Sequence, residues 1–213
     1  MFVRPSLGRL FGRRPLAARV STRSSAQTPV RRKALFEALD AAGRLDDTLV
    51  MFWNDHGEQL FEHGARGHAI SLFGEETDGF ALFWARGLSP AVWDEATTNL
   101  DLMPTALWLL DIDPPPGLAG DVVGTAPAER PVFGTVAPIG RPPQQSVTVG
   151  NRKLIYRWDG LKSLFLRDTD PAEANNVYDD NPAVVQAMWD LLLPEVERAE
   201  PFIADYTPES PGP

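Results

Sequence analysis

The segment 48–53 constrains the fold of this chain more than any other. Its six residues, Thr-Leu-Val-Met-Phe-Trp, are largely apolar, β-branched or aromatic and show no polar alternation, which is typical of a strand buried on both faces of a sheet. It follows residues 31–42, where apolar side chains recur at helical spacing and Gly43 is placed as a C-terminal stop. A helix, a short turn and a buried strand predict an α/β fold.

Downstream segments continue this pattern and then change it. Residues 80–84 predict a strand and residues 99–110 a helix, with Pro104 tolerated in its first turn. Residues 113–145 are rich in proline and glycine, which indicates extended connections with one short strand near 132–136.

The C-terminal part predicts a small antiparallel sheet followed by a helix. Apolar runs separated by the turn dipeptides Gly150-Asn151 and Asp159-Gly160 are the strongest short-range signal for hairpins. The three predicted strands are residues 146–149, 153–158 and 162–166. A last helix is expected from Asn181 and Pro182 to about Glu197.

Charge divides the chain into a leader and a body. Residues 1–33 carry nine basic residues and no acidic one, so the remaining 180 hold 11 basic and 29 acidic residues, and the whole has a net charge of −9. We therefore predict a basic, disordered leader over residues 1–33 and a frayed tail over 201–213. No apolar run is long enough for a secretory signal or a membrane helix, so we expect a soluble body, with the cytoplasm favoured.

All three histidines, His56, His63 and His68, fall within 13 residues, directly after the strongest strand candidate. In open α/β sheets the binding crevice lies outside the carboxyl ends of the strands, so this is the expected place for a site. The adjacent Asp55 and His56 can supply one oxygen and one nitrogen ligand to a divalent ion. The polar loop 54–78 is therefore the candidate functional segment.

The run from Asp46 through Asn54-Asp55-His56-Gly57-Glu58 to Glu62-His63-Gly64 resembles the signature of the sulfatase family, within the alkaline-phosphatase-like superfamily. Further segments are similar to the family's motifs and occur in the same order. These are Gly67-His68 with Ser71-Leu72-Phe73 and Glu75-Glu76, the "D-x-x-P-T" helix start at Asp101–Thr105, the "K-L-I" run at Lys153–Ile155, and the "D-P-x-E-x-x-N" turn at Asp170–Asn176.

The resemblance implies a fold and a set of boundaries. The fold is part of an alkaline-phosphatase-like mixed α/β sheet with flanking helices, followed by the small antiparallel sheet and the C-terminal helix. The C-terminal part of a sulfatase-like catalytic core then spans residues 34–140, and the small sheet with its helix spans residues 141–200.

The resemblance also implies roles for individual residues. Asp55 and His56 match the family's second pair of metal ligands, and an Asp-His pair shifts the preference from Ca²⁺ toward Mg²⁺, Mn²⁺ or Zn²⁺ because imidazole is a softer ligand than an amide oxygen. His68 falls where the family places a cation near the leaving oxygen, whose developing charge it could stabilise. Glu58 and His63 are expected to shape the loop through hydrogen bonds.

The family's nucleophile is missing from this sequence. Sulfatases place a cysteine or serine, converted to formylglycine, in a C/S-x-P-x-R motif, but this chain has no cysteine, and we expect that formylglycine is not possible in it. The nearest fit, Gln27-Thr28-Pro29-Val30-Arg31, has glutamine at the nucleophile position, and we interpret it as coincidence. Asp55 and His56 supply two ligands, whereas a catalytic site needs three or more.

These observations favour one function and leave two alternatives. The first hypothesis is a sulfatase-like, metal-dependent hydrolase of sulfuric or phosphoric esters, truncated, without its nucleophile half and inactive alone. The alternatives are a non-catalytic divalent-metal or anion-binding module, and a half-enzyme completed in trans. The expected partners are a small sulfate or phosphate ester and a missing N-terminal half, with no nucleic acid and no membrane. The choice between sulfate, phosphate and phosphonate esters stays open.

Overall fold

The computed structural model describes residues 27–93 and 96–203. Residues 1–26 of the predicted leader (1–33) and residues 204–213 of the predicted tail (201–213) lie outside these ranges. The chain divides into two compact units, and each is considered by itself. Among the described residues, the first unit contains 27–54, 80–93 and 98–126, and the second contains 55–79, 96–97 and 127–203.

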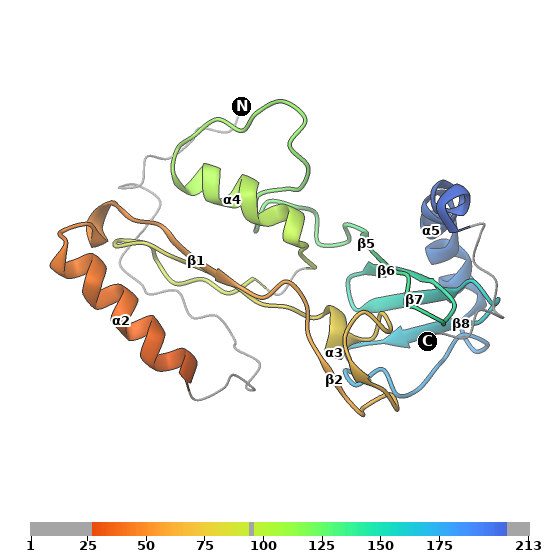
Figure 1. Cartoon of the computed structure of the whole chain (residues 1–213). Helices are drawn as coiled ribbons and strands as arrows, with labels where there is room; N and C mark the ends of the chain where they lie inside the picture. Colours follow the sequence, from red (N-terminus) through yellow and green to blue (C-terminus); the bar gives the residue numbers. More distant parts are fainter. Residues whose placement is uncertain (1–26, 94–95, 204–213) are drawn as a thin grey trace. The chain divides into compact units, whose positions relative to one another are not determined.

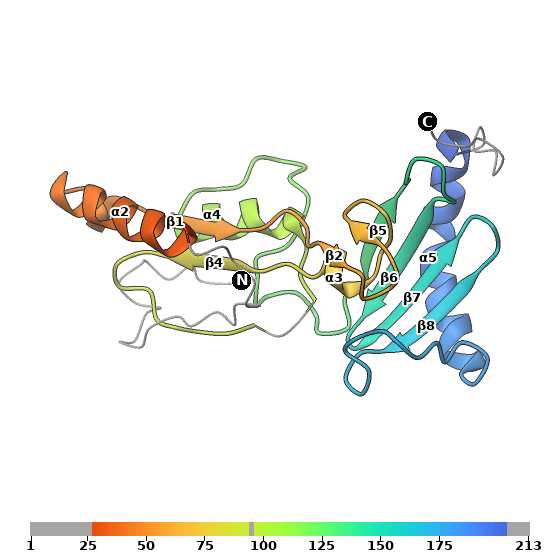
Figure 2. The same cartoon turned by 60° about the horizontal axis from the view of Figure 1, so that its bottom comes forward.

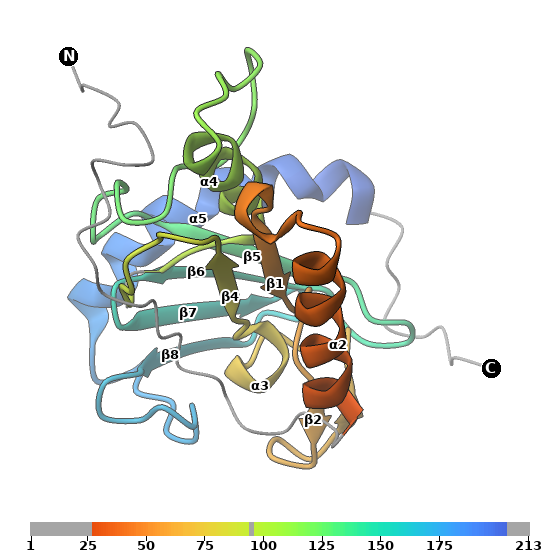
Figure 3. The same cartoon turned by 90° about the vertical axis from the view of Figure 1, so that its left-hand side faces the viewer.

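The first unit pairs two short strands between helices (Figure 3). Strand β1 (Val50–Trp53) runs antiparallel to β4 (Ala81–Trp84), with Met51 opposite Phe83. The helical elements are α2 (Gln27–Ala41), η1 (Leu45–Asp47), η2 (Asn99–Asp101) and α4 (Leu102–Leu109). Phe83, Ala106 and Leu109 form the buried core of this unit, so α4 packs on β4.

The helix and strands of this unit depart from expectation in two ways. Helix α2 begins at Gln27, inside the predicted leader, so the chance fit to the nucleophile motif at residues 27–31 is helical. Strand β1 has four residues, three of them half-buried, and the Trp53 side chain is exposed. The prediction of a strand buried on both faces is therefore wrong, because β1 belongs to a two-stranded pair rather than to the middle of a wide sheet in the described part of the chain.

The second unit is built on a four-stranded antiparallel sheet in chain order (Figure 2). Its strands are β5 (Val132–Val136), β6 (Gln144–Val149), β7 (Arg152–Arg157) and β8 (Lys162–Leu166). Gly150 has a φ of +57° and Gly160 a φ of +94°, which is the left-handed conformation that the two turn dipeptides are suited to. The three predicted strands are confirmed. Strand β5, which precedes the expected boundary at residue 140, belongs to the same sheet.

Helix α5 (Pro182–Ile203) covers one face of this sheet. Side chains alternate across the strands, so Val147, Leu154 and Leu164 point to the same face and pack with Met188 and Leu192 of the helix. The helix begins where Pro182 predicts and continues beyond Glu197 to Ile203. In the part of the chain that the structure describes, none of the helices is both long and apolar enough to cross a membrane.

Residues 55–79 lie on the opposite face of the same sheet (Figures 1 and 2), and we call them the site segment. The site segment contains β2 (Gln59–Leu60), which pairs with β3 (Arg66–Gly67), and the single turn α3 (Gly74–Thr77). Its Leu72 is buried with Ile155 and Phe165 of the sheet. The sheet is thus sandwiched between α5 and the segment that carries all three histidines.

Candidate functional site

The site segment is folded back on itself by a close backbone contact. The Gly57 amide donates to the carbonyl oxygen of Glu76 over 2.8 Å. A Cβ atom on residue 57 would lie 2.0 Å from the carbonyl oxygen of Glu75, closer than any real contact. Only glycine allows this approach, so the residue after the Asp55-His56 pair is fixed by packing.

Glu76 organises the interior of the segment. Its buried carboxylate accepts from Gln59 Nε2 (2.6 Å), from Ser71 Oγ (2.7 Å) and from the Ile70 amide (2.9 Å). Burial raises the pKa of Glu76, but these hydrogen bonds favour the charged form and outweigh burial, so the pKa is lowered overall. The charged carboxylate therefore ties the β2 end of the segment to the turn before α3.

Asp55, His56, Glu58 and His68 gather at the surface of the segment, and we call them the Asp55 cluster. The rings of His56 and His68 lie 4.3 Å apart between centroids. His68 Nδ1 lies 3.1 Å from Glu58 Oε2, so this nitrogen carries the proton that the carboxylate accepts. The His68 ring is thus held by Glu58 at Nδ1 and lies beside the His56 ring.

Asp55 and His56 fit a divalent cation in part. His56 Nδ1 lies 2.8 Å from the carbonyl oxygen of Gly57, which fixes Nδ1 as the donor and places the lone pair of the neutral ring on Nε2. That Nε2 lies 3.8 Å from Asp55 Oδ2, and two ligands about 2.1 Å from one tetrahedral ion lie roughly 3.4 Å apart. However, no group of three or more acidic, histidine or cysteine residues that could hold a metal occurs among residues 27–93 and 96–203.

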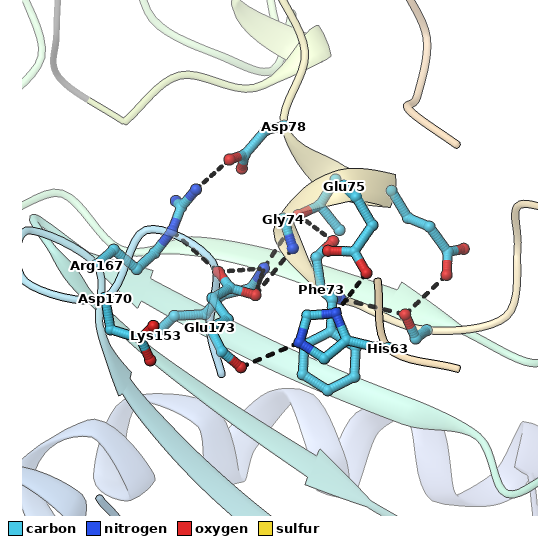
Figure 4. A network of polar contacts seen from close by, with 12 residues as sticks. His63, Phe73, Gly74, Glu75, Asp78, Lys153, Arg167, Asp170 and Glu173 are labelled. Atoms are coloured by element: carbon cyan, nitrogen blue, oxygen red, sulfur yellow. Dashed lines mark hydrogen bonds and ion pairs between the residues drawn. The ribbon is translucent and has the colours of Figure 1, made fainter. Parts of the chain in front are cut away.

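His63 lies in a second, half-buried cluster, apart from the Asp55 cluster in its contacts (Figure 4). Its ring stacks on Phe73 with centroids 3.7 Å apart and planes 2° from parallel. Nδ1 lies 2.5 Å from Glu75 Oε1, and Nε2 lies 3.1 Å from the carbonyl oxygen of Glu173. Both ring nitrogens face acceptors, so only the doubly protonated ring satisfies both.

The electrostatics of His63 agree with this geometry. Burial of the ring lowers the pKa of His63, whereas the hydrogen bonds to Glu75 and to the Glu173 carbonyl, with the charges of both carboxylates, raise it. The raising contributions prevail, and the pKa lies above the usual value for histidine.

Glu173 is the centre of a buried ion-pair network on the sheet face (Figure 4). Its carboxylate lies 3.2 Å from Lys153 Nζ and 2.9 Å from Arg167 Nε, and it accepts from the Gly74 amide over 2.8 Å. Arg167 also pairs with Asp78. Burial, with a further contribution from Arg167, lowers the pKa of Lys153 despite the opposing charges of Glu173 and Asp78.

The comparisons with known proteins agree with the sequence motifs. Residues 33–112, which include the Asp55 cluster, match the family model described as Sulfatase. The choline-sulfatase of Rhizobium meliloti (strain 1021) is 27% identical over 156 residues, which cover 70% of this chain and 30% of that protein. This chain therefore spans less than a third of the length of that relative.

Solved structures give the fold. A 2-O GAG sulfatase has a TM-score of 0.68 at 20% identity, with 85% of this chain and 46% of that chain covered. The described chain covers part of the sulfatase fold. The phosphonate monoester hydrolase of Agrobacterium radiobacter is similar as well, with a TM-score of 0.66 at 20% identity and coverage of 81% of this chain and 40% of that chain.

Within this sulfatase fold, the residues singled out from the sequence separate into two groups. The structure brings Asp55, His56, Glu58 and His68 together and places His63 in the network around Glu173. Sequence reasoning gave no role to Lys153 or Glu173. The signal was present, because both occur in segments that resemble sulfatase motifs, the "K-L-I" run and the "D-P-x-E-x-x-N" turn.

Proposed function

We propose that this chain supplies the second half of a sulfatase-type site that hydrolyses sulfuric or phosphoric esters. The observation that carries the proposal is the grouping of Asp55, His56 and His68 on one segment inside the region that matches the sulfatase family. The sulfatase fold and the family match support a sulfatase-like hydrolase in general. The roles of the individual residues are the finer part of the proposal.

In this site Asp55 Oδ2 and His56 Nε2 would hold a divalent cation, with Mg²⁺, Mn²⁺, Zn²⁺ and Ca²⁺ as the candidates. A bound cation supplies polarisation of the ester oxygen and stabilises negative charge there. The Gly57 carbonyl fixes the tautomer of His56, as a second-sphere partner does for many metal-binding histidines. The remaining ligands would come from residues outside the Asp55 cluster.

His68 would act on the anionic end of the substrate. Glu58 accepts from Nδ1 of His68, which orients the ring. In its doubly protonated, cationic form the ring would also donate through Nε2–H to an oxygen bound beside Asp55 and His56. Such a preorganised donor stabilises charge that develops on the leaving oxygen. Glu58 orients His68, whereas His63 stabilises the segment from its other side.

The nucleophile would be supplied from outside the described residues, so we propose that this chain does not turn over esters alone. The substrate class stays open between sulfate, phosphate and phosphonate esters, because the residue that discriminates them is the nucleophile. The relatives reflect the same range, since one is named a choline-sulfatase and another a phosphonate monoester hydrolase.

A reconstitution assay tests this function. The chain is produced alone and together with a polypeptide that carries the C/S-x-P-x-R motif of a sulfatase N-terminal half, and each is assayed on an aryl sulfate, an aryl phosphate and a phosphonate monoester with added Mn²⁺. We expect hydrolysis only in the combined preparation. His68→Ala should lower kcat by about 10²- to 10³-fold, the usual effect of removing one preorganised donor.

Asp190→Ala serves as the matched control, because this exposed carboxylate lies on α5 and accepts a hydrogen bond from Gln186. It should leave the rate unchanged. Hydrolysis that survives Asp55→Ala, His56→Ala and His68→Ala at the level of this control would overturn the proposal.

A further inference from the structure

The backbone of Glu173 adopts a conformation that is strained for a residue with a side chain. Its φ is +52°, in the left-handed region, where glycine is accepted without strain and other residues are not. Its side chain is also fully buried and carries a charge. Glycine would relieve the strain and remove the buried carboxylate at once, so a glutamate at this position indicates that its side chain is needed.

The contacts of Glu173 show what the side chain is needed for. One carboxylate oxygen lies near Lys153 of β7 and Arg167 after β8, which belong to the sheet. The other accepts from the amide of Gly74, which belongs to the site segment. The backbone carbonyl of the same residue faces His63, also in the site segment. Glu173 therefore connects the site segment to the sheet through two contacts, one with Gly74 and one with His63.

Both contacts of Glu173 with the site segment, at Gly74 and at His63, involve residues that adjoin or contact the turn α3. Gly74 opens the turn α3, which contains Glu75 and Glu76. The Glu76 carbonyl in turn holds the amide of Gly57. A continuous chain of contacts thus leads from Glu173 through α3 to the residue that follows His56.

We infer that Glu173 is a positioning residue, which holds the site segment on the sheet and fixes the place of Asp55 and His56. The positioning role follows from the contacts of Glu173 alone and holds whatever the chain binds. Its consequence for cation binding rests on the proposed function.

Hydrogen–deuterium exchange on the full chain tests the inference, with Glu173→Gly as the decisive variant. If residue 173 served only to make the turn, glycine would relieve the backbone strain, and the amides of residues 55–79 would exchange at the same rate or more slowly. A positioning role predicts that amides of residues 55–79 exchange at least about tenfold faster, the effect of losing a charged hydrogen bond, while those of β6, β7 and α5 keep their protection. Glu173→Asp should restore part of the protection.

Two further variants keep the test sharp. Asp111→Gly is the control, because Asp111 is exposed, has a φ of +57° and belongs to the other unit, so it should not change exchange in the site segment. Lys153→Met with Glu173→Gln removes both buried charges together, avoids an unpaired lysine, and should also loosen the segment because the Gly74 amide and Arg167 lose the carboxylate.

The exchange experiment tests the role of Glu173, and a separate titration tests the proposed function. Unchanged exchange over residues 55–79 in both Glu173→Gly and the double variant overturns the inference, whatever the chain binds. Faster exchange there supports it. A Zn²⁺ titration of the same proteins then reports on the proposed site, which fails by itself if the wild type binds no Zn²⁺ through His56.

Discussion

At the scale of single residues, the three histidines of the site segment differ in what their ring nitrogens face. His56 directs one nitrogen to a backbone carbonyl and the other toward Asp55, whereas His68 is held by Glu58. His63 has an acceptor at both nitrogens. The first two lie at the surface, where we propose that they meet ligands, and the third is held by internal contacts at both nitrogens.

The protonation of His63 predicts a dependence of stability on pH. Because the folded pKa is raised above that of the unfolded chain, the stabilisation is fully present below about pH 6.5 and is lost as the pH rises through the folded pKa. Urea unfolding should therefore show a free energy that falls as the pH rises above 6.5. The fall should be smaller in His63→Gln, and an equal fall in both proteins would show that His63 is not responsible.

Gly57 predicts a steric effect at the site. Alanine at residue 57 would place its Cβ against the backbone of Glu75, so the segment must shift or the contact must break. We expect Gly57→Ala to lower the free energy of unfolding by about 1–3 kcal/mol, the usual cost of overpacking. Gly64→Ala is the comparison, because its Cβ meets no atom within 4 Å and only the positive φ of +77° opposes it. Equal stability of Gly57→Ala and the wild type in urea unfolding would contradict this account.

The sequence singles out some residues of the candidate site but not others. Asp55, His56 and His68 stand out in the sequence because metal-ligating residue types cluster after a strand and match sulfatase motifs, and their roles stay predictions. Glu173 and Lys153 were not given a role, because a lone glutamate or lysine in a sequence normally lies in solvent. The burial of Glu173 and Lys153 depends on the packing of a strand against a turn 20 residues away in the chain. A local sequence pattern does not show that packing.

At the scale of elements, the packing of α5 on the sheet predicts where the second unit gets its stability. Leu192 is fully buried against the sheet, while the adjacent Leu191 is 40% exposed. Leu192→Ala should lower the free energy of unfolding by about 2–5 kcal/mol because it leaves a cavity in the core. Leu191→Ala should change it by about 0.5 kcal/mol or less. Similar losses from both substitutions in urea unfolding would mean that α5 does not pack as described.

The elements themselves were predicted best where local chemistry decides them. The glycines of Gly150-Asn151 and Asp159-Gly160 favour the turn conformation, and apolar runs on both sides set the strands. The burial of β1 was predicted wrongly, because an apolar run does not reveal how many strands flank it. The site segment was expected to be a loop. Its short β2 contacts Glu76 and its turn α3 contacts Glu173, and a sequence pattern does not show these contacts.

At the scale of the whole molecule, similarity to known proteins extends over most of this chain but less than half of each relative reported above. The sulfatase fold is therefore present in part, and in the proposed function the Asp55 cluster would supply two of the ligands that a complete metal site needs. This is the physical basis for proposing that the remaining ligands and the nucleophile come from elsewhere.

The most direct test of this account is a Zn²⁺ titration followed by nitrogen-15 NMR of the histidine rings, which is practical because the chain has only three histidines. Zn²⁺ should shift the Nε2 resonance of His56, and Asp55→Ala should weaken the apparent affinity at least about tenfold, as loss of a metal-site partner commonly does. His63 should keep both ring protons. A His56 signal that does not respond to Zn²⁺, or that responds equally in the wild type and Asp55→Ala, would contradict the account.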